Sequence, residues 1–315
     1  MKRPCLALAL LAIPACTDST KAPEPVAAPA EKAGPVDVKV SSFPALYLVQ
    51  RVGGAAVAVT NILPAGEDPP FWNPTGEQVA QMQAAELIVA NGAGFEKWME
   101  TATLPASKMV DTAAKVDLIH VEATTHSHGK GGEHSHAGID PHTWSDPLIY
   151  LQQAEVVHAA LVKARPSEQA TFDAGLAALR TDLQALDGEL KASLAHAGDK
   201  RLAANHPAFN YLAKRYELQI KSFDFDPEEA PSADARHGFD HWAEDVPEPR
   251  MLWWESPAVD AAKRAFPPGT IHVFVDPLEQ PAEDGAGYDY MAQARSNVHT
   301  FRSLFPAPAP EGAPE

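Results

Sequence analysis

Seven apolar residues, spaced three or four positions apart, indicate one long helix within residues 166–195. They are Phe172, Leu176, Leu179, Leu183, Leu186, Leu190 and Leu194. This spacing places them on one face of an α-helix of about 28 residues, roughly 40 Å long. Pro166 and Ser167 suit its first turn. A helix of this length is predicted to run between two lobes and pack on both. An isolated coiled coil is less favoured, because the flanking segments look globular.

Apolar runs alternate with helical segments on both sides of this helix. Residues 36–40 and 87–90 are predicted strands, as are the buried runs "VDLIHV" and "IHVFVDPL". Strands that alternate with helices predict parallel sheets and an α/β fold. The expected architecture is an N-terminal lobe at 36–165 and a C-terminal lobe at 196–305, each with a parallel-type sheet flanked by helices. Ligands of such sheets collect at the carboxyl ends of the strands, which predicts a binding site in the cleft between the lobes.

The two ends of the chain carry a different composition. The N-terminus "MKRPCLALALLAIPAC" has two basic residues and an apolar run too short to span a bilayer, which predicts a signal peptide at 1–15. The "IPAC" ending at Cys16 resembles a bacterial lipobox, so Cys16 is the predicted lipidation site. An ordinary signal peptide with an accidental cysteine is the alternative. Residues 16–35 and 306–315, rich in Pro and Ala, predict a disordered tether and a disordered tail.

Composition excludes several classes of partner and ligand. Cys5 and Cys16 are the only cysteines, so the mature chain has no internal disulfide, and a metal would be bound by histidines and carboxylates. The formal net charge of −17 and the lack of a basic stripe argue against nucleic acid.

Five of the 13 histidines lie between residues 126 and 142. The first four, His126, His128, His134 and His136, fall in a segment of Gly, Ser, Lys and Glu that cannot build a packed core. Short His-rich tracts are typical of metal binding. Residues 123–138 are therefore predicted to form a flexible loop that collects or senses zinc, the alternative being an accidental polar loop.

The fifth histidine, His142 in "DPHTWSDP", has a counterpart in His206 of "NHPAF". Each follows a predicted strand or loop that can open to the cleft, one in each half of the chain. Two imidazoles and one or two carboxylates would form a four-coordinate site that suits zinc. Taken singly, each is more often a hydrogen-bonded structural histidine.

Other candidates receive a structural interpretation. His120 and His272 are predicted strand residues satisfied in or near the core. Trp253 and Trp254 are predicted to pack at a strand end, and Glu255 either packs with them or faces the cleft.

Several segments together resemble one known family, the solute-binding lipoproteins of zinc and manganese ABC transporters. They are "NILPAGEDPPFWNPTGEQVAQMQAAELIVANGAGFEKWM", "GIDPHTWSDP", "NHPAFNYLAKRYEL", "DPEEAPSAD" and "VFVDPLEQ", in the family's order. The resemblance covers nearly the whole mature chain. It implies two α/β lobes joined by one rigid helix, with the metal between them. It also implies a monomeric receptor without catalytic activity, exported to the periplasm or cell surface and held to the membrane through Cys16. Such a receptor delivers Zn²⁺, or another divalent ion such as Mn²⁺, to the permease of an ABC importer.

The same resemblance implies ligands at particular positions. His142 and His206 match the family's second and third histidines. The place of the first histidine holds Pro70, which offers no side-chain ligand. Glu67 or Asp68, in the same turn, is the candidate replacement. A mobile-loop histidine, such as His134 or His136, is another candidate.

The family's late carboxylate, which only some members have, falls at Tyr288 in this chain. The adjacent Asp289, or Asp284 nearby, could supply the oxygen instead. A site with two histidines and carboxylates is expected to be harder than a three-histidine site and to accept manganese more readily. Because imidazoles bind metal only when neutral, binding is expected to weaken as the pH falls through about 6.5.

Two other functions remain open at this point. A degenerate family member could buffer zinc as an accessory lipoprotein, an interpretation supported by Pro70. A hydrolytic metalloenzyme would need an open coordination position and a general base. No "HExxH" motif is present, and the pair Glu133-His134 lies in the flexible loop.

Overall fold

We describe the chain from a computed structural model, which covers residues 32–121, 125–127, 133–135, 138–198, 200–279 and 288–308. Residues Ala33–Glu315 form one compact unit. The predicted signal peptide, Cys16 and nearly all of the tether lie outside the described residues. Within the described part, no helix combines the length and the apolarity that crossing a membrane requires.

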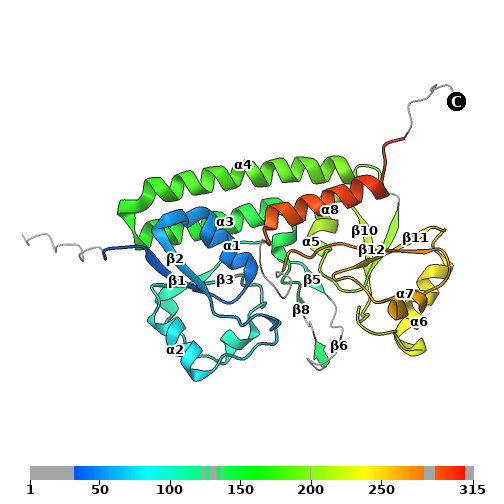
Figure 1. The fold of residues 1–315 in the computed structure, drawn as a ribbon, viewed down its shortest axis with the longest axis horizontal. Helices are drawn as coiled ribbons and strands as arrows, with labels where there is room; N and C mark the ends of the chain where they lie inside the picture. Colours follow the sequence, from blue (N-terminus) through cyan, green and yellow to red (C-terminus); the bar gives the residue numbers. More distant parts are fainter. Residues whose placement is uncertain are drawn as a thin grey trace, which may run out of the picture. The chain divides into compact units, whose positions relative to one another are not determined.

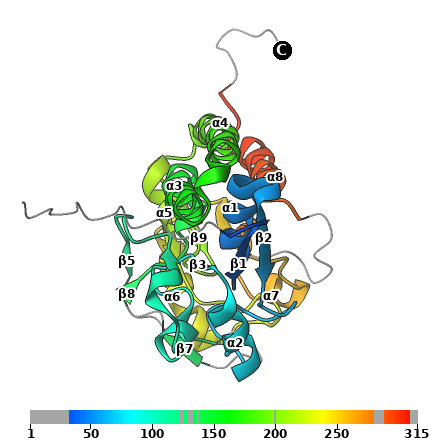
Figure 2. The ribbon, with the colours of Figure 1, turned by 90° about the vertical axis from the view of Figure 1, so that its left-hand side faces the viewer.

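The first lobe contains a parallel four-stranded sheet with the order β2-β1-β3-β4. Its strands are β1 (Val36–Val40), β2 (Val57–Asn61), β3 (Leu87–Ala90) and β4 (Met109–Asp111). Helices α1 (Phe43–Gly53) and α3 (Pro147–Ala164) bury apolar residues against one face, and α2 (Gly76–Ala84) packs with Trp98 on the other (Figure 2). The β3 strand is buried on both faces, as expected for a parallel sheet covered by helices.

The second lobe repeats this plan. Its parallel sheet has the order β10-β9-β11-β12. The strands are β9 (Arg201–Ala204), β10 (Gln219–Ser222), β11 (Arg250–Trp254) and β12 (Thr270–Phe274). Helices α5 (Asn210–Tyr216) and α8 (Tyr290–Leu304) share one core with α4, and α6 (Ala233–Glu244) and α7 (Asp260–Arg264) form the core on the other face.

The predicted long helix is α4 (Gln169–Leu194), 26 residues that follow a 3-10 turn at Pro166–Glu168. Of the seven predicted apolar residues all but Leu176 are buried, and Leu176 packs against the same core. The helix contacts α1 and α3 of the first lobe and α8 of the second (Figure 1). Its apolar face therefore forms one core with both lobes.

In both sheets the strands stand in the order second, first, third, fourth along the chain. The direction of the connections reverses between the first and third strands, which are β1 and β3 in one lobe and β9 and β11 in the other. Ligands of open parallel sheets bind beyond the carboxyl ends of the strands at such a reversal. The α/β architecture with two parallel sheets and a long helix confirms the predicted fold class.

One predicted strand was wrong in extent and burial. The run "VDLIHV" contributes only β5 (His120–Val121), which pairs antiparallel with β8 (Gly138–Ile139) outside either parallel sheet. Because this pair lies outside both parallel sheets, His120 is not buried in their cores and is exposed. His272, in β12, accepts a hydrogen bond from Nε1 of Trp254 at 3.0 Å, as a strand residue satisfied near the core.

Candidate metal site

His142 lies in the segment between β8 and α3 and is 3% exposed. The Asp140 carboxylate fixes its orientation: Oδ1 accepts the backbone N–H of His142 at 2.9 Å and lies 2.7 Å from ring Nδ1. Because a carboxylate only accepts, Nδ1 carries the hydrogen and Nε2 is left to face another group. A carboxylate behind a histidine in this way is the usual support of a metal ligand.

His206 follows β9 of the second lobe and lies beside His142. It is 6% exposed, and its ring centroid lies 5.5 Å from that of His142, with the rings nearly perpendicular at 82°. The neighbouring Asn205 is bound to β11, since its backbone N–H donates to the Trp253 carbonyl at 2.9 Å. The structure thus brings the two predicted histidines together, one from each lobe.

Glu279 supplies a carboxylate to this pair. It follows β12, and its Oε2 lies 3.7 Å from Nε2 of His142, with the Glu279 side chain 14% exposed. Sequence reasoning missed Glu279. Its position after the predicted strand "IHVFVDPL", at a carboxyl end, is a signal that could have found it.

Two more carboxylates share the electrostatic environment of His142. Burial, followed by the charge of Glu279, raises the pKa of Asp68 to about 7. The same two causes raise the pKa of Glu255 to about 8, and its Oε1 lies 3.3 Å from Nδ2 of Asn205. The opposing charge of His142 acts on both carboxylates. The Glu255 carboxylate therefore lies close enough to His142 for the two charges to interact.

The charge of His142 itself follows from these neighbours. Burial lowers its pKa, but the negative charges of Asp140 and Glu279 outweigh burial and raise the pKa to about 10. At neutral pH the imidazole is therefore protonated on both nitrogens. A cation at Nε2 would have to displace a proton.

The remaining predicted residues differ in burial and in their hydrogen bonds. Glu67 is exposed, whereas Asp68 is half-buried and its carbonyl accepts the N–H groups of Phe71 and Trp72. Asp289 is exposed, and its carboxylate accepts the Ala292 N–H at 2.9 Å as the N-cap of α8.

The His-rich segment is described in part. Strands β6 (Thr125–Ser127) and β7 (Glu133–Ser135) pair antiparallel, with His126 opposite His134. His128, His136 and the alternative ligand Asp284 lie outside the described residues.

Among the residues that the structure describes, no group of three or more His, Cys, Asp or Glu side chains is gathered closely enough to hold an ion at once. The structure does bring the two histidines together. Glu279 lies 3.7 Å from Nε2 of His142, and the carboxylates of Asp68 and Glu255 interact electrostatically with His142. This donor set, two imidazoles and oxygens, suits a divalent transition metal.

Known proteins resemble most of this chain in sequence and in fold. The family model "Zinc-uptake complex component A periplasmic" (ZnuA) matches residues 38–304. The zinc-binding lipoprotein AdcA of Streptococcus pneumoniae is 27% identical over 296 residues, which cover 90% of this chain and 58% of AdcA. The chain thus spans just over half the length of this relative.

Two solved structures show the same fold. One is the Zn(II)-bound ZnuA-like domain of Streptococcus pneumoniae AdcA, with a TM-score of 0.72, 23% identity, and coverage of 86% of this chain and 99% of that domain. The other is FpvC of Pseudomonas aeruginosa in complex with Mn²⁺, with a TM-score of 0.67, 22% identity, and coverage of 85% and 98%. The family match over residues 38–304 confirms the resemblance drawn from the sequence, and the chain belongs to the family of the periplasmic zinc-uptake component ZnuA.

Proposed function

We propose that this chain is an extracytoplasmic receptor that binds Zn²⁺ between its two lobes and delivers it to an ABC-type importer. The observation that carries the proposal is the buried pair His142 and His206, one from each lobe, with ring centroids 5.5 Å apart. Family membership supports it, as does the zinc bound by the AdcA domain of the same fold.

The proposed ligands are Nε2 of His142, the imidazole of His206 and the carboxylate of Glu279. Two ligand atoms at about 2.0–2.1 Å from a tetrahedral zinc ion lie roughly 3.4 Å apart. The 3.7 Å between Nε2 of His142 and Oε2 of Glu279 is close to that separation. A small movement would let one ion accept both atoms once the proton on Nε2 has left.

Asp68 or Glu255 is the proposed source of the remaining oxygen ligand. Both carboxylates have pKa values raised by burial and by the nearby Glu279, so each is costly to ionise without a cation. A divalent ion would remove that cost. Asp68 also answers the question raised by Pro70, because it offers an oxygen from the turn in which the family's first histidine is missing.

The His-rich loop is proposed to collect zinc or sense its abundance. Its histidines are His126, His128, His134 and His136. The chain is further proposed to be a monomer, anchored through a lipid on Cys16 and partnered by an importer permease.

Zinc titration of the mature chain, by calorimetry or dye competition, tests this function. The control is a variant that lacks residues 126–136. We expect one tight site per chain that survives the deletion. Loss of all tight binding with the loop would instead favour an accessory zinc-buffering protein. Absence of tight binding in the intact chain would contradict the proposal.

A further inference from the structure

The turn that carries Glu279 is held by hydrogen bonds at successive residues. The Asn297 side chain makes two bonds to the backbone of Asp276: Oδ1 accepts its N–H at 3.0 Å and Nδ2 donates to its carbonyl at 2.8 Å. Oδ1 of Asp276 accepts the N–H of Leu278 at 2.8 Å and the hydroxyl of Tyr288 at 2.8 Å. Leu278 is kept at φ +62°, a conformation that a leucine adopts only when its surroundings require it.

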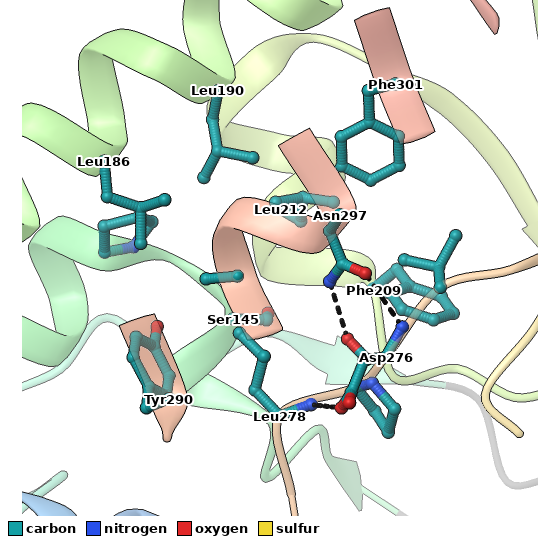
Figure 3. A pocket seen from close by; sticks show the side chains of 14 residues that line it. Ser145, Leu186, Leu190, Phe209, Leu212, Asp276, Leu278, Tyr290, Asn297 and Phe301 are labelled. Carbon is teal, nitrogen blue, oxygen red and sulfur yellow. Dashed lines mark hydrogen bonds between the residues drawn. The ribbon is translucent and has the colours of Figure 1, made fainter. Parts of the chain in front are cut away.

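Packing and hydrogen bonds both hold this turn. Figure 3 shows an apolar pocket beside it, lined by Leu186 and Leu190 of α4, by residues of α8 and by the turn itself. The turn is also held by hydrogen bonds, three of which are drawn in Figure 3 between Asp276, Leu278 and Asn297.

Trp144 connects this turn to His142 across the two lobes. It is fully buried, and its indole Nε1 donates to the carbonyl of Pro277 at 2.9 Å, two residues before Glu279. The same ring lies edge-on to His142, with centroids 5.3 Å apart. Its own carbonyl accepts the Tyr290 hydroxyl of α8 at 2.7 Å. One side chain thus contacts a first-lobe histidine and the turn that bears the second-lobe carboxylate.

We propose that Trp144 is a positioning residue for the metal site, whose indole N–H sets the distance between His142 and Glu279. The inference rests on the proposed function, because it assigns Trp144 a role only if these two residues share an ion. Without the N–H, the Pro277 carbonyl loses its donor and the turn loses its hydrogen bond to the first lobe. The Glu279 carboxylate would then leave its place opposite Nε2 of His142.

Trp144→Phe tests this, because phenylalanine keeps an aromatic ring and removes the N–H. We expect zinc affinity to fall by about tenfold to a hundredfold, the usual effect of losing a residue that supports a metal ligand. Trp242→Phe is the matched control: it also shortens a nearly buried tryptophan, but in the core formed by α6. Its affinity should equal that of wild type. The visible absorption of bound Co²⁺ depends on the geometry of its ligands. This spectrum should differ from that of wild type in Trp144→Phe but not in Trp242→Phe.

A double-mutant cycle with Glu279→Gln separates positioning from general damage. If Trp144 acts through Glu279, Trp144→Phe should cost little further affinity once Glu279 is replaced. An equal loss in both backgrounds would overturn the inference. Tyr288→Phe releases the same turn from another side and should lower affinity in wild type but not in Glu279→Gln. If Trp144→Phe does not fold, the Tyr288→Phe variant tests the inference in its place.

The controls distinguish two kinds of failure. Wild-type protein without tight zinc binding would overturn the proposed function and this inference with it. Tight wild-type binding with undiminished affinity and an unchanged Co²⁺ spectrum in Trp144→Phe would overturn the inference alone.

Discussion

Oδ1 of Asp140 accepts two hydrogen bonds from His142, one from its backbone N–H at 2.9 Å and one from ring Nδ1 at 2.7 Å. The carboxylate thereby fixes both the rotation of the ring and the nitrogen that carries hydrogen. It also places a negative charge behind the imidazole, which favours a cation at Nε2, whether that cation is a proton or a metal ion.

Replacing Asp140 by Asn should separate these effects. Asp140→Asn can still accept the His142 backbone N–H, but it removes the charge. We expect the pKa of His142 to fall from about 10 towards its ordinary value, and zinc affinity to fall by about tenfold or more. NMR titration of the His142 ring and dye competition measure the two quantities. A His142 pKa unchanged in the variant would contradict this account.

Zinc binding should release protons, and affinity should rise with pH. In the metal-free protein the pKa values are about 10 for His142, about 8 for Glu255 and about 7 for Asp68, so at pH 7 the first two are mainly protonated. Each proton displaced adds up to about one unit of log affinity per pH unit. The sensitive range therefore extends above the pH of about 6.5 expected for an unperturbed histidine. Calorimetry in buffers of different ionisation enthalpy counts the protons; a heat independent of buffer would contradict the prediction.

Alanine at both His142 and His206 should abolish tight zinc binding and leave the fold intact. The two rings are the nitrogen donors of the proposed site. The matched control replaces His241 and His299, which are exposed, and should bind as wild type does. Affinity by competition and secondary structure by circular dichroism are the measurements. Unchanged affinity in the His142/His206 double variant would show that the site lies elsewhere.

Asp68 and Glu67 are neighbours that differ in burial, and they make a matched pair. We expect Asp68→Asn to lower the affinity for Mn²⁺ more than the affinity for Zn²⁺, because manganese depends more on hard oxygen ligands. Glu67→Gln should change neither affinity, since Glu67 is exposed. Parallel titrations with both metals decide this. An Asp68→Asn variant with wild-type affinity for both ions would leave Glu255 as the proposed oxygen donor.

Two glycines of α4 give opposite predictions for stability. A Cβ on Gly175 would lie 2.3 Å from the Val52 carbonyl oxygen and 2.7 Å from that of Arg51, at the close approach of α4 to α1. Gly175→Ala should therefore lower the free energy of unfolding by about 1–3 kcal/mol, the range for overpacking. A Cβ on Gly188 meets nothing within 4 Å, so Gly188→Ala should raise the free energy of unfolding by about 0.5–1 kcal/mol. Urea denaturation of both variants measures these changes. If both substitutions changed the free energy of unfolding in the same direction, the prediction would be contradicted.

The sequence alone predicted the parts that periodicity and local patterns determine. The strand–helix alternation predicted two parallel sheets, and the apolar face of α4 predicted a long helix that packs on both lobes. His206 could be singled out because it follows the end of a predicted strand, where open sheets bind ligands, and His142 because it lies between two Asp-Pro pairs just after the His-rich loop.

Other parts depend on contacts that a sequence does not display. The place of Glu279 depends on a turn in which Leu278 has positive φ and in which Asn297 holds the backbone of Asp276, 21 residues earlier. Glu255 is oriented by Asn205, 50 residues earlier. Asp289 had a local signal that went unused, since an aspartate just before a helix is a common N-cap.

The two sheets follow one plan but contribute unequally to the proposed site. Asp68 and His142 come from the first lobe, whereas His206, Glu255 and Glu279 follow the first, third and fourth strands of the second. If Glu255 supplies the fourth ligand, a bound ion would have three bonds to the second lobe and one to the first, whereas Asp68 would give two bonds to each lobe. In the proposed receptor with Glu255 as the fourth ligand, the ion would therefore break fewer bonds by leaving the first lobe than by leaving the second.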